Sequence, residues 1–248
     1  MFKRGSVIPY ITAGDPDMET TLEFLQAVDE FAGAIELGIP FSDPMADGKI
    51  IQDSHHRALR NGCTVNDVFS LLRKFRKLSD TLVVLMTYYN PVYVMGVKNF
   101  VENAKAGGAD GILVVDLPVS HASELLEAAH DASLHTVFLA APNTPDERLR
   151  EIDVASTGFV YLISLYGTTG ARNEVPESAF RMIRRARGIC QNLIAVGFGV
   201  SRREHVESLI KKGADGVVVG SALMKLVGEH GREAAGALKE KMRELSGL

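Results

Sequence analysis

The sequence predicts a (β/α)₈ barrel that occupies residues 1–248 as a single phosphate-binding domain. Eight short apolar runs rich in β-branched residues follow one another along the chain, and helix-like segments separate them. The length of 248 residues is close to the roughly 250 that such barrels typically need. No linker, low-complexity tract or change of composition divides the chain, so we expect one domain.

The eight runs are almost continuously apolar, as expected of parallel strands that are buried on both faces. They are Ser6–Ala13, Ala34–Pro40, Thr81–Tyr89, Gly111–Pro118, His135–Pro142, Gly158–Leu165, Leu193–Val200 and Gly216–Leu223. The segments between them have helical spacing: Leu22, Leu25 and Val28 recur every three residues after the first run. A strand followed by a helix, eight times over, favours a closed barrel over an open sheet.

A short repeat marks two of the junctions between a helix and the next strand. Residues 108–111 and residues 213–216 both read Gly-Ala-Asp-Gly. Glycine commonly ends a helix because it adopts a left-handed conformation without a Cβ clash. Asp110 and Asp215 precede strands, which places them at the amino-terminal face of a barrel, where residues serve stability. We therefore interpret both aspartates as structural.

The overall composition excludes several classes of function. The net charge of −4 leaves no basic surface for nucleic acid. The two cysteines, Cys63 and Cys190, are far apart and lack C-x-x-C spacing, which argues against zinc and disulfides and fits a reducing cytoplasm. No apolar stretch approaches the ~20 residues of a membrane span, so we expect a cytoplasmic protein.

The candidate catalytic residues are carboxylates at the carboxyl ends of the predicted strands, where barrels of this type place function. Glu36 stands in the otherwise apolar second strand. If it points into the barrel, desolvation raises its pKa toward the range in which it can both give and take a proton. It could equally face the surrounding helices with a salt-bridge partner, and position alone leaves the two alternatives even.

The loop after this strand, residues 41–48, adds two carboxylates within reach of Glu36. Two carboxyl groups in different environments can divide the roles of acid and base. Asp43 precedes a proline and Asp47 precedes a glycine, so each could instead form a turn. We favour the turn for Asp43, and we favour the chemical role for Asp47 because of the resemblance described below.

The loops after the last three strands resemble a phosphate site. Residues 197–201 and Gly220-Ser221 bring glycines to the ends of strands seven and eight, and a helical segment follows Ser221. Glycine lets the backbone approach an anion, and a helix N-terminus offers free N–H groups. Residues 166–172, after the sixth strand, supply further donors, and three such loops on adjacent strands indicate phosphate binding.

The placement of lysine and histidine argues against two kinds of aldol chemistry. A Schiff-base enzyme needs a buried lysine, and no lysine lies in a predicted strand. A metal enzyme needs converging ligands, yet only His121 among the seven histidines follows a strand end. We interpret His55-His56 as helix surface, expect no metal site, and assign the chemistry to carboxylates.

Two runs carry a specific resemblance to a known family. They are Pro9-Tyr10-Ile11-Thr12-Ala13-Gly14-Asp15-Pro16 and Glu36-Leu37-Gly38-Ile39-Pro40-Phe41-Ser42-Asp43-Pro44-Met45-Ala46-Asp47-Gly48. Shorter matches lie at residues 88–91, 116–118, 141–144, 161, 169–170, 197–199 and 220–221. Together they resemble the tryptophan synthase alpha subunit over nearly the whole chain, and the second run is highly specific.

The resemblance implies roles for individual residues. Glu36 would protonate C3 of the indole ring and take the proton of the side-chain hydroxyl, and Asp47 would hold or remove the indole N–H proton. Tyr161 would line the pocket near the glutamate. The substrate-binding set implied by the resemblance comprises Tyr10, Met86, Tyr88, Leu113 and Phe198 around the indole ring, with Thr169, Gly170, Gly199, Gly220 and Ser221 around the phosphate.

The resemblance further implies retro-aldol cleavage of indole-3-glycerol phosphate to indole and glyceraldehyde 3-phosphate, in tryptophan biosynthesis. It implies no cofactor in this chain, with pyridoxal phosphate confined to a beta subunit that would join it in an α₂β₂ heterotetramer. Many members carry a short helix before the first strand, whereas about five residues precede it here, which puts the packing of the barrel bottom in doubt.

Two other functions are compatible with parts of the pattern. Another phosphate-binding barrel, acting on ribulose or amino phosphates, would share the glycine loops but not the arrangement of Glu36 and Asp47. A non-catalytic regulatory subunit would keep the barrel and the phosphate site and lose one of these carboxylates. Both carboxylates are present, which favours the lyase.

Overall fold

The computed structural model describes residues 2–163 and 175–248 of the chain. Its strands are parallel, pair in sequence order and close into a barrel when β8 pairs with β1. The strands are β1 (Ser6–Thr12), β2 (Ile35–Gly38), β3 (Val83–Thr87), β4 (Gly111–Val114), β5 (His135–Ala140), β6 (Phe159–Ile163), β7 (Leu193–Gly197) and β8 (Gly216–Val219). The predicted fold class is confirmed.

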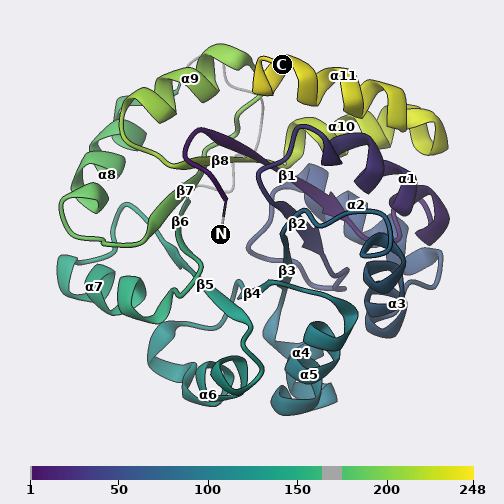
Figure 1. The fold of residues 1–248 in the computed structure, drawn as a ribbon, viewed down its shortest axis with the longest axis horizontal. Helices are drawn as coiled ribbons and strands as arrows, with labels where there is room; N and C mark the ends of the chain where they lie inside the picture. Colours follow the sequence, from purple (N-terminus) through teal and green to yellow (C-terminus); the bar gives the residue numbers. More distant parts are fainter. Residues whose placement is uncertain (1, 164–174) are drawn as a thin grey trace.

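Helices surround this barrel on the outside, as the ring of coils in Figure 1 shows. They are α1 (Met18–Asp29), α2 (Lys49–Arg60), α3 (Val65–Phe75), α4 (Tyr89–Met95), α5 (Val97–Gly107), α6 (Ser123–Asp131), α7 (Asp146–Ala155), α8 (Glu177–Arg187), α9 (Arg203–Lys211), α10 (Ser221–His230) and α11 (Ala234–Ser246), with short 3₁₀ turns η1 (Val119–His121) and η2 (Gly231–Glu233). Most of them contact the strands, as α7 does at β5 and α10 at β1.

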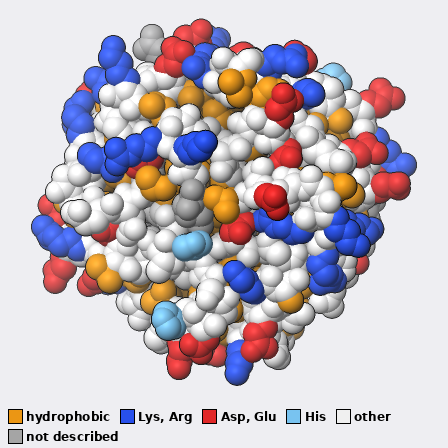
Figure 2. All heavy atoms as spheres, in the orientation of Figure 1, with side chains coloured by type: hydrophobic (Ala, Val, Ile, Leu, Met, Phe, Trp, Pro, Cys, Tyr) orange, Lys and Arg blue, Asp and Glu red, His pale blue; other side chains and the backbone are white. Residues whose placement is uncertain are grey.

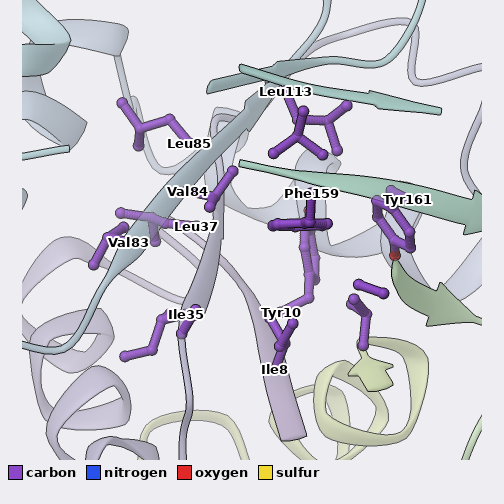
Figure 3. Packing of buried hydrophobic residues seen from close by; sticks show 14 of the residues in the cluster. Ile8, Tyr10, Ile35, Leu37, Val83, Val84, Leu85, Leu113, Phe159 and Tyr161 are labelled. Carbon is purple, nitrogen blue, oxygen red and sulfur yellow. The ribbon is translucent and has the colours of Figure 1, made fainter. Parts of the chain in front are cut away.

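The strand register separates the side chains that fill the barrel from those that face the helices. Tyr10 pairs with Glu36, which pairs with Val84, so these three side chains share the inner face. The alternating residues, such as Leu37 and Leu85, pair with each other on the outer face. Figure 3 shows both sets, with Tyr10, Leu113, Phe159 and Tyr161 on the inner side of the strands and Ile35, Leu37, Val83 and Leu85 on the outer side.

The amino-terminal end of the barrel is closed by Phe2. The segment before β1 lies over the middle of the strand ring in Figure 1. Phe2 is 5 % exposed, and its ring meets that of Phe159 edge to face at 5.3 Å. A Cβ at Gly216 would come within 2.7 Å of the Phe2 ring, so the glycine makes room for it. One aromatic side chain therefore packs the barrel bottom in this chain.

Both aspartates of the repeated Gly-Ala-Asp-Gly sequence stabilise this same end. Asp110 accepts a hydrogen bond from the Val83 N–H (2.8 Å) and pairs with Arg76. Asp215 accepts one from the Ile194 N–H (2.8 Å) and pairs with Arg187 and Arg4. Gly108 ends α5 in the left-handed conformation. The structural interpretation of these residues is confirmed.

The predicted apolar runs extend beyond most strands at their carboxyl ends. The run Gly111–Pro118, for example, contains β4 but continues past Val114. These additional residues stay apolar because they pack around the mouth of the barrel, where Leu117 is buried outside any strand. Hydrophobicity alone does not separate strand from buried loop there.

The molecular surface has a mixed charge. On the face drawn in Figure 2, acidic and basic side chains are interspersed. Among the described residues, no helix has the length and apolarity to cross a membrane.

Candidate active site

A cleft opens at the carboxyl ends of the strands, and residues from six strands, the loops that follow them, α2 and α10 line it. Both predicted catalytic carboxylates, Glu36 and Asp47, lie in its wall. The remaining lining residues are Tyr10, Ile51, Met86, Tyr161, Gly197, Gly199, Val200, Val218, Gly220 and Ser221. The cleft is at the end of the barrel where this fold places active sites.

Glu36 points into the barrel, which decides between the two alternatives that the sequence left even. It is 2 % exposed, and its Oε1 has no hydrogen-bond partner among the described residues. Burial, together with the nearby Asp47 charge, raises the pKa of Glu36 from 4.5 to about 8. At neutral pH the group is therefore a carboxylic acid with a proton to donate.

Asp47 lies on the loop 41–48 and is held by Tyr88, the residue before α4. The Tyr88 hydroxyl donates a hydrogen bond to Asp47 Oδ2 (2.6 Å) and accepts one from the Ala46 N–H (3.1 Å). Burial raises the pKa of Asp47 to about 6, and the hydrogen bond from Tyr88 opposes this rise. Asp47 is therefore mostly ionised at neutral pH, in contrast to Glu36.

Two tyrosines, Tyr10 and Tyr161, line the cleft, and each lies against a glycine of the neighbouring strand. A Cβ at Gly38 would be 2.2 Å from the Tyr10 hydroxyl oxygen, and a Cβ at Gly197 would be 2.6 Å from that of Tyr161. In both cases the glycine lies two residues beyond the register partner of the tyrosine. Larger residues at these strand ends would displace the tyrosines that face Glu36.

The described part of the predicted phosphate site is assembled at β7, β8 and α10. Gly199, Gly220 and Ser221 line one end of the cleft, and Ser221 is the first residue of α10. Gly199 has a φ of 70°, a left-handed conformation that favours glycine. The N–H groups of the first helical turn have no partner within the helix and carry partial positive charge, which suits an anion.

The histidine interpretation needs a correction. His56 is exposed, but His55 is 2 % exposed and lies beneath the loop 41–48, not on the helix surface. Its Nδ1 accepts a hydrogen bond from the Phe41 N–H (3.1 Å), and its Nε2 is 3.0 Å from the Tyr10 hydroxyl. Two adjacent histidines on a helix necessarily point in different directions, so one can be buried while the other is solvated.

The other predicted residues are placed as follows. Tyr10, Met86 and Tyr161 line the cleft. Tyr88 contacts Asp47, and Leu113 and Phe198 are buried without lining the cleft. Thr169 and Gly170 lie outside the described residues. Ile51, Val200 and Val218 line the cleft without having been predicted, although Val218 could have been found because it lies two residues beyond Gly216 on β8 and so faces the same side of the strand.

The described residues contain no group of three or more histidine, cysteine, aspartate or glutamate side chains placed to hold a metal ion. Cys63 and Cys190 are both free and buried. No lysine is among the described residues that line the cleft. The titratable side chains among these residues are the two carboxyl groups and the hydroxyls of Tyr10 and Tyr161.

Comparison with known proteins identifies the family. The sequence pattern described as "Tryptophan synthase alpha chain" matches residues 2–247. The chain belongs to the tryptophan synthase alpha chain family. Among similar members, that of Thermococcus kodakarensis is 70 % identical, with 100 % of this chain and 98 % of that protein covered. That of Pyrococcus furiosus is 65 % identical, with both chains covered in full.

Solved structures of tryptophan synthase have the same fold as this chain. A chain of the tryptophan synthase α₂β₂ complex from Pyrococcus furiosus superposes with a TM-score of 0.97 at 65 % identity, with 100 % of both chains covered. The tryptophan synthase alpha subunit from the same organism superposes with a TM-score of 0.96 at 64 % identity, again over 100 % of both chains.

Proposed function

We propose that this chain catalyses the retro-aldol cleavage of indole-3-glycerol phosphate to indole and glyceraldehyde 3-phosphate, the alpha reaction of tryptophan synthase. The observation that carries this proposal is a pair of carboxyl groups in one cleft, the buried Glu36 and the half-buried Asp47, with different protonation at neutral pH. Family membership over residues 2–247 supports it.

Glu36 acts first as an acid. Its carboxylic acid donates a proton to C3 of the indole ring, which places a positive charge on the ring and its nitrogen. The ionised Asp47 carboxylate accepts a hydrogen bond from the ring N–H and stabilises this charge. A half-buried carboxylate is a stronger partner for such a charge than one in bulk water, because water screens the interaction less.

Glu36 then acts as a base. As a carboxylate it takes the proton of the hydroxyl on the carbon attached to C3, and the carbon–carbon bond breaks. The bonding electrons return to the ring, which leaves as indole, and the carbon that bears the deprotonated hydroxyl becomes the aldehyde carbon of glyceraldehyde 3-phosphate. One carboxyl group thus gives and regains one proton, and a pKa near the working pH suits both steps.

The rest of the cleft orients the substrate. We propose that the N–H groups at Gly199, Gly220 and Ser221 bind the phosphate, together with Thr169 and Gly170 from the loop after β6. Tyr10, Met86, Tyr88, Leu113 and Phe198 are proposed to surround the indole ring, and Tyr161 to contact the substrate beside Glu36. Holding both ends of the substrate places C3 against Glu36, which lowers the entropic part of the barrier.

We propose that the chain needs neither metal nor pyridoxal phosphate for this reaction. The absence of lysine from the lining of the cleft supports this proposal. Cleavage should continue in the presence of a chelator, and borohydride should trap no substrate adduct on the chain. Loss of activity in EDTA, or a trapped adduct, would contradict the carboxylate mechanism.

We propose that a tryptophan synthase beta subunit, which would carry the pyridoxal phosphate, docks beside the cleft in an α₂β₂ complex. The two segments next to Tyr88 support this site. Met45 on the loop 41–48 is 88 % exposed, and Tyr93 and Val94 on α4 are 70 % and 77 % exposed. Exposed apolar groups of this kind mark protein interfaces. Docking there would act on Asp47 through Tyr88.

The experiment is incubation of the chain with indole-3-glycerol phosphate, with and without a beta subunit. We expect indole release by the isolated chain and faster release with the partner. Glu36→Gln should abolish release in both cases, since glutamine keeps the shape of the side chain without a transferable proton. Substantial turnover by a pure Glu36→Gln variant would refute the proposal.

A further inference from the structure

Helix α2 begins directly after the loop 41–48 and turns one face back beneath it. Gln52 and His55, three residues apart, lie on this face. Residues at this spacing project from the same side of a helix. Neither side chain lines the cleft, yet both contact the backbone of the loop that carries Asp47.

Gln52 binds the second half of the loop. Its Nε2 donates to the carbonyl oxygen of Asp47 (2.9 Å) and to that of Pro44 (3.3 Å). Both acceptors are carbonyl oxygens, so only the nitrogen of the side-chain amide can face them. Gln52 therefore fixes Asp47 from its backbone, while the Tyr88 hydroxyl fixes the same residue from its carboxylate.

His55 binds the start of the loop and connects it to the wall of the cleft. Because Nδ1 accepts from the Phe41 N–H, the proton of the neutral ring lies on Nε2, which donates to the Tyr10 hydroxyl oxygen. The ring also packs edge to face against Tyr88, with the ring centroids 6.4 Å apart. Thr12 donates to the same tyrosine oxygen (3.1 Å).

We propose that Gln52 and His55 are positioning residues that hold the loop 41–48 at both ends, so that α2 sets the place of Asp47 relative to Glu36. The inference deepens the proposed function and rests on the part assigned there to Asp47. Neither side chain contacts substrate. Their effect on the rate comes through the orientation of a catalytic group, for which a displacement of about 1 Å can cost on the order of 100-fold.

The test uses the full chain with Gln52→Leu and Gln52→Glu. Leucine removes both donated hydrogen bonds, and glutamate keeps the size of glutamine but presents oxygens to the two carbonyls. We expect kcat to fall by about 10-fold or more in both variants. Inhibition by glycerol 3-phosphate should be unchanged, because Gly220 and Ser221 lie on another part of the cleft. A fall in kcat without a change in this affinity separates positioning from general loss of structure.

Hydrogen exchange of the backbone amides gives a readout that does not depend on activity. The amides of Ala46 and Asp47, bonded to Tyr88 and Pro44 in the wild type, should exchange faster in both Gln52 variants. His55→Phe keeps a ring against Tyr88 but removes the acceptor, so the Phe41 amide should exchange faster there. Gln26→Leu, the same change as Gln52→Leu on the exposed side of α1, should match the wild type in every measurement.

The outcomes are distinct. Wild-type kcat and wild-type exchange in the Gln52 variants would overturn the proposal. A parallel loss of kcat and of glycerol 3-phosphate affinity would also overturn it, since that pattern indicates a disturbed fold. If the wild-type chain released no indole, the proposed function would fail, whereas the exchange comparison would still decide whether Gln52 and His55 hold the loop.

Discussion

Replacement of Glu36 by glutamine should stabilise the folded protein, by an amount that depends on pH. Glu36 has a pKa of about 8 in the folded state against an ordinary value of 4.5. Between these values the folded protein binds a proton that the unfolded chain releases, so the free energy of unfolding falls as pH rises. Each pH unit in this range lowers the free energy of unfolding by about 1.4 kcal/mol, and the whole range lowers it by at most about 5 kcal/mol.

The glutamine side chain does not titrate, so the free energy of unfolding of the variant does not fall with pH for this reason. Below pH 4.5 both side chains are neutral, and the difference in unfolding free energy between variant and wild type should be constant. From there to about pH 8 the difference should grow in favour of the variant, and above pH 8 it should level off. The measurement is guanidinium unfolding of both proteins across pH 4–9, followed by circular dichroism because the chain has no tryptophan. Parallel stability curves over this range would refute the assignment of a protonated Glu36.

Three further outcomes are expected. The rate of cleavage should rise through about pH 6 as Asp47 ionises and fall above about pH 8 as Glu36 loses its proton. Asp47→Asn should lose most of the activity, and the rise of the rate near pH 6 should disappear. A rise that is unchanged in this variant would assign it to another group. Gly220→Asp should weaken glycerol 3-phosphate binding by more than about 10-fold, because the added Cβ would lie 3.3 Å from Tyr10 Cβ and the new charge repels the phosphate. Equilibrium binding that matches the wild type would relocate the anion site. Asp215→Ala should lower the free energy of unfolding by about 3 kcal/mol, because Arg187 and the Ile194 N–H lose their acceptor. An unchanged midpoint of denaturant unfolding would contradict this prediction.

The barrel could be predicted from the sequence because its signals are local and repeated. The eight apolar runs and the Gly-Ala-Asp-Gly junctions each depend on a few neighbouring residues, and the structure confirms the strands and the structural aspartates. The strand ends were predicted less well. Loop residues such as Leu117 are as buried as strand residues, so their hydrophobicity reports burial and not strand conformation.

The residues that support the site could not be predicted in the same way. The orientation of Glu36 depends on the parity of β2 within the closed barrel, which the single polar residue of that strand does not reveal. His55 was interpreted as helix surface because its partners, Phe41 and Tyr10, lie 14 and 45 residues away. The glycine beside each tyrosine also required the register between strands, since Gly38 is 28 residues from Tyr10 in sequence but adjacent in space.

The two carboxyl groups differ in burial and in hydrogen bonding. Glu36 is buried and its Oε1 has no partner among the described residues, whereas Asp47 is half-buried and receives a hydrogen bond from Tyr88. Burial therefore raises the pKa of Glu36 further, and the charge of Asp47 raises it again. The position of the loop 41–48 thus acts on both groups at once: moving Asp47 away removes a negative charge that adds to the effect of burial on the pKa of Glu36. Any contact that orders this loop, from Gln52 below or from a partner protein on Met45 above, acts on the proton donor as well as on the carboxylate that the loop carries.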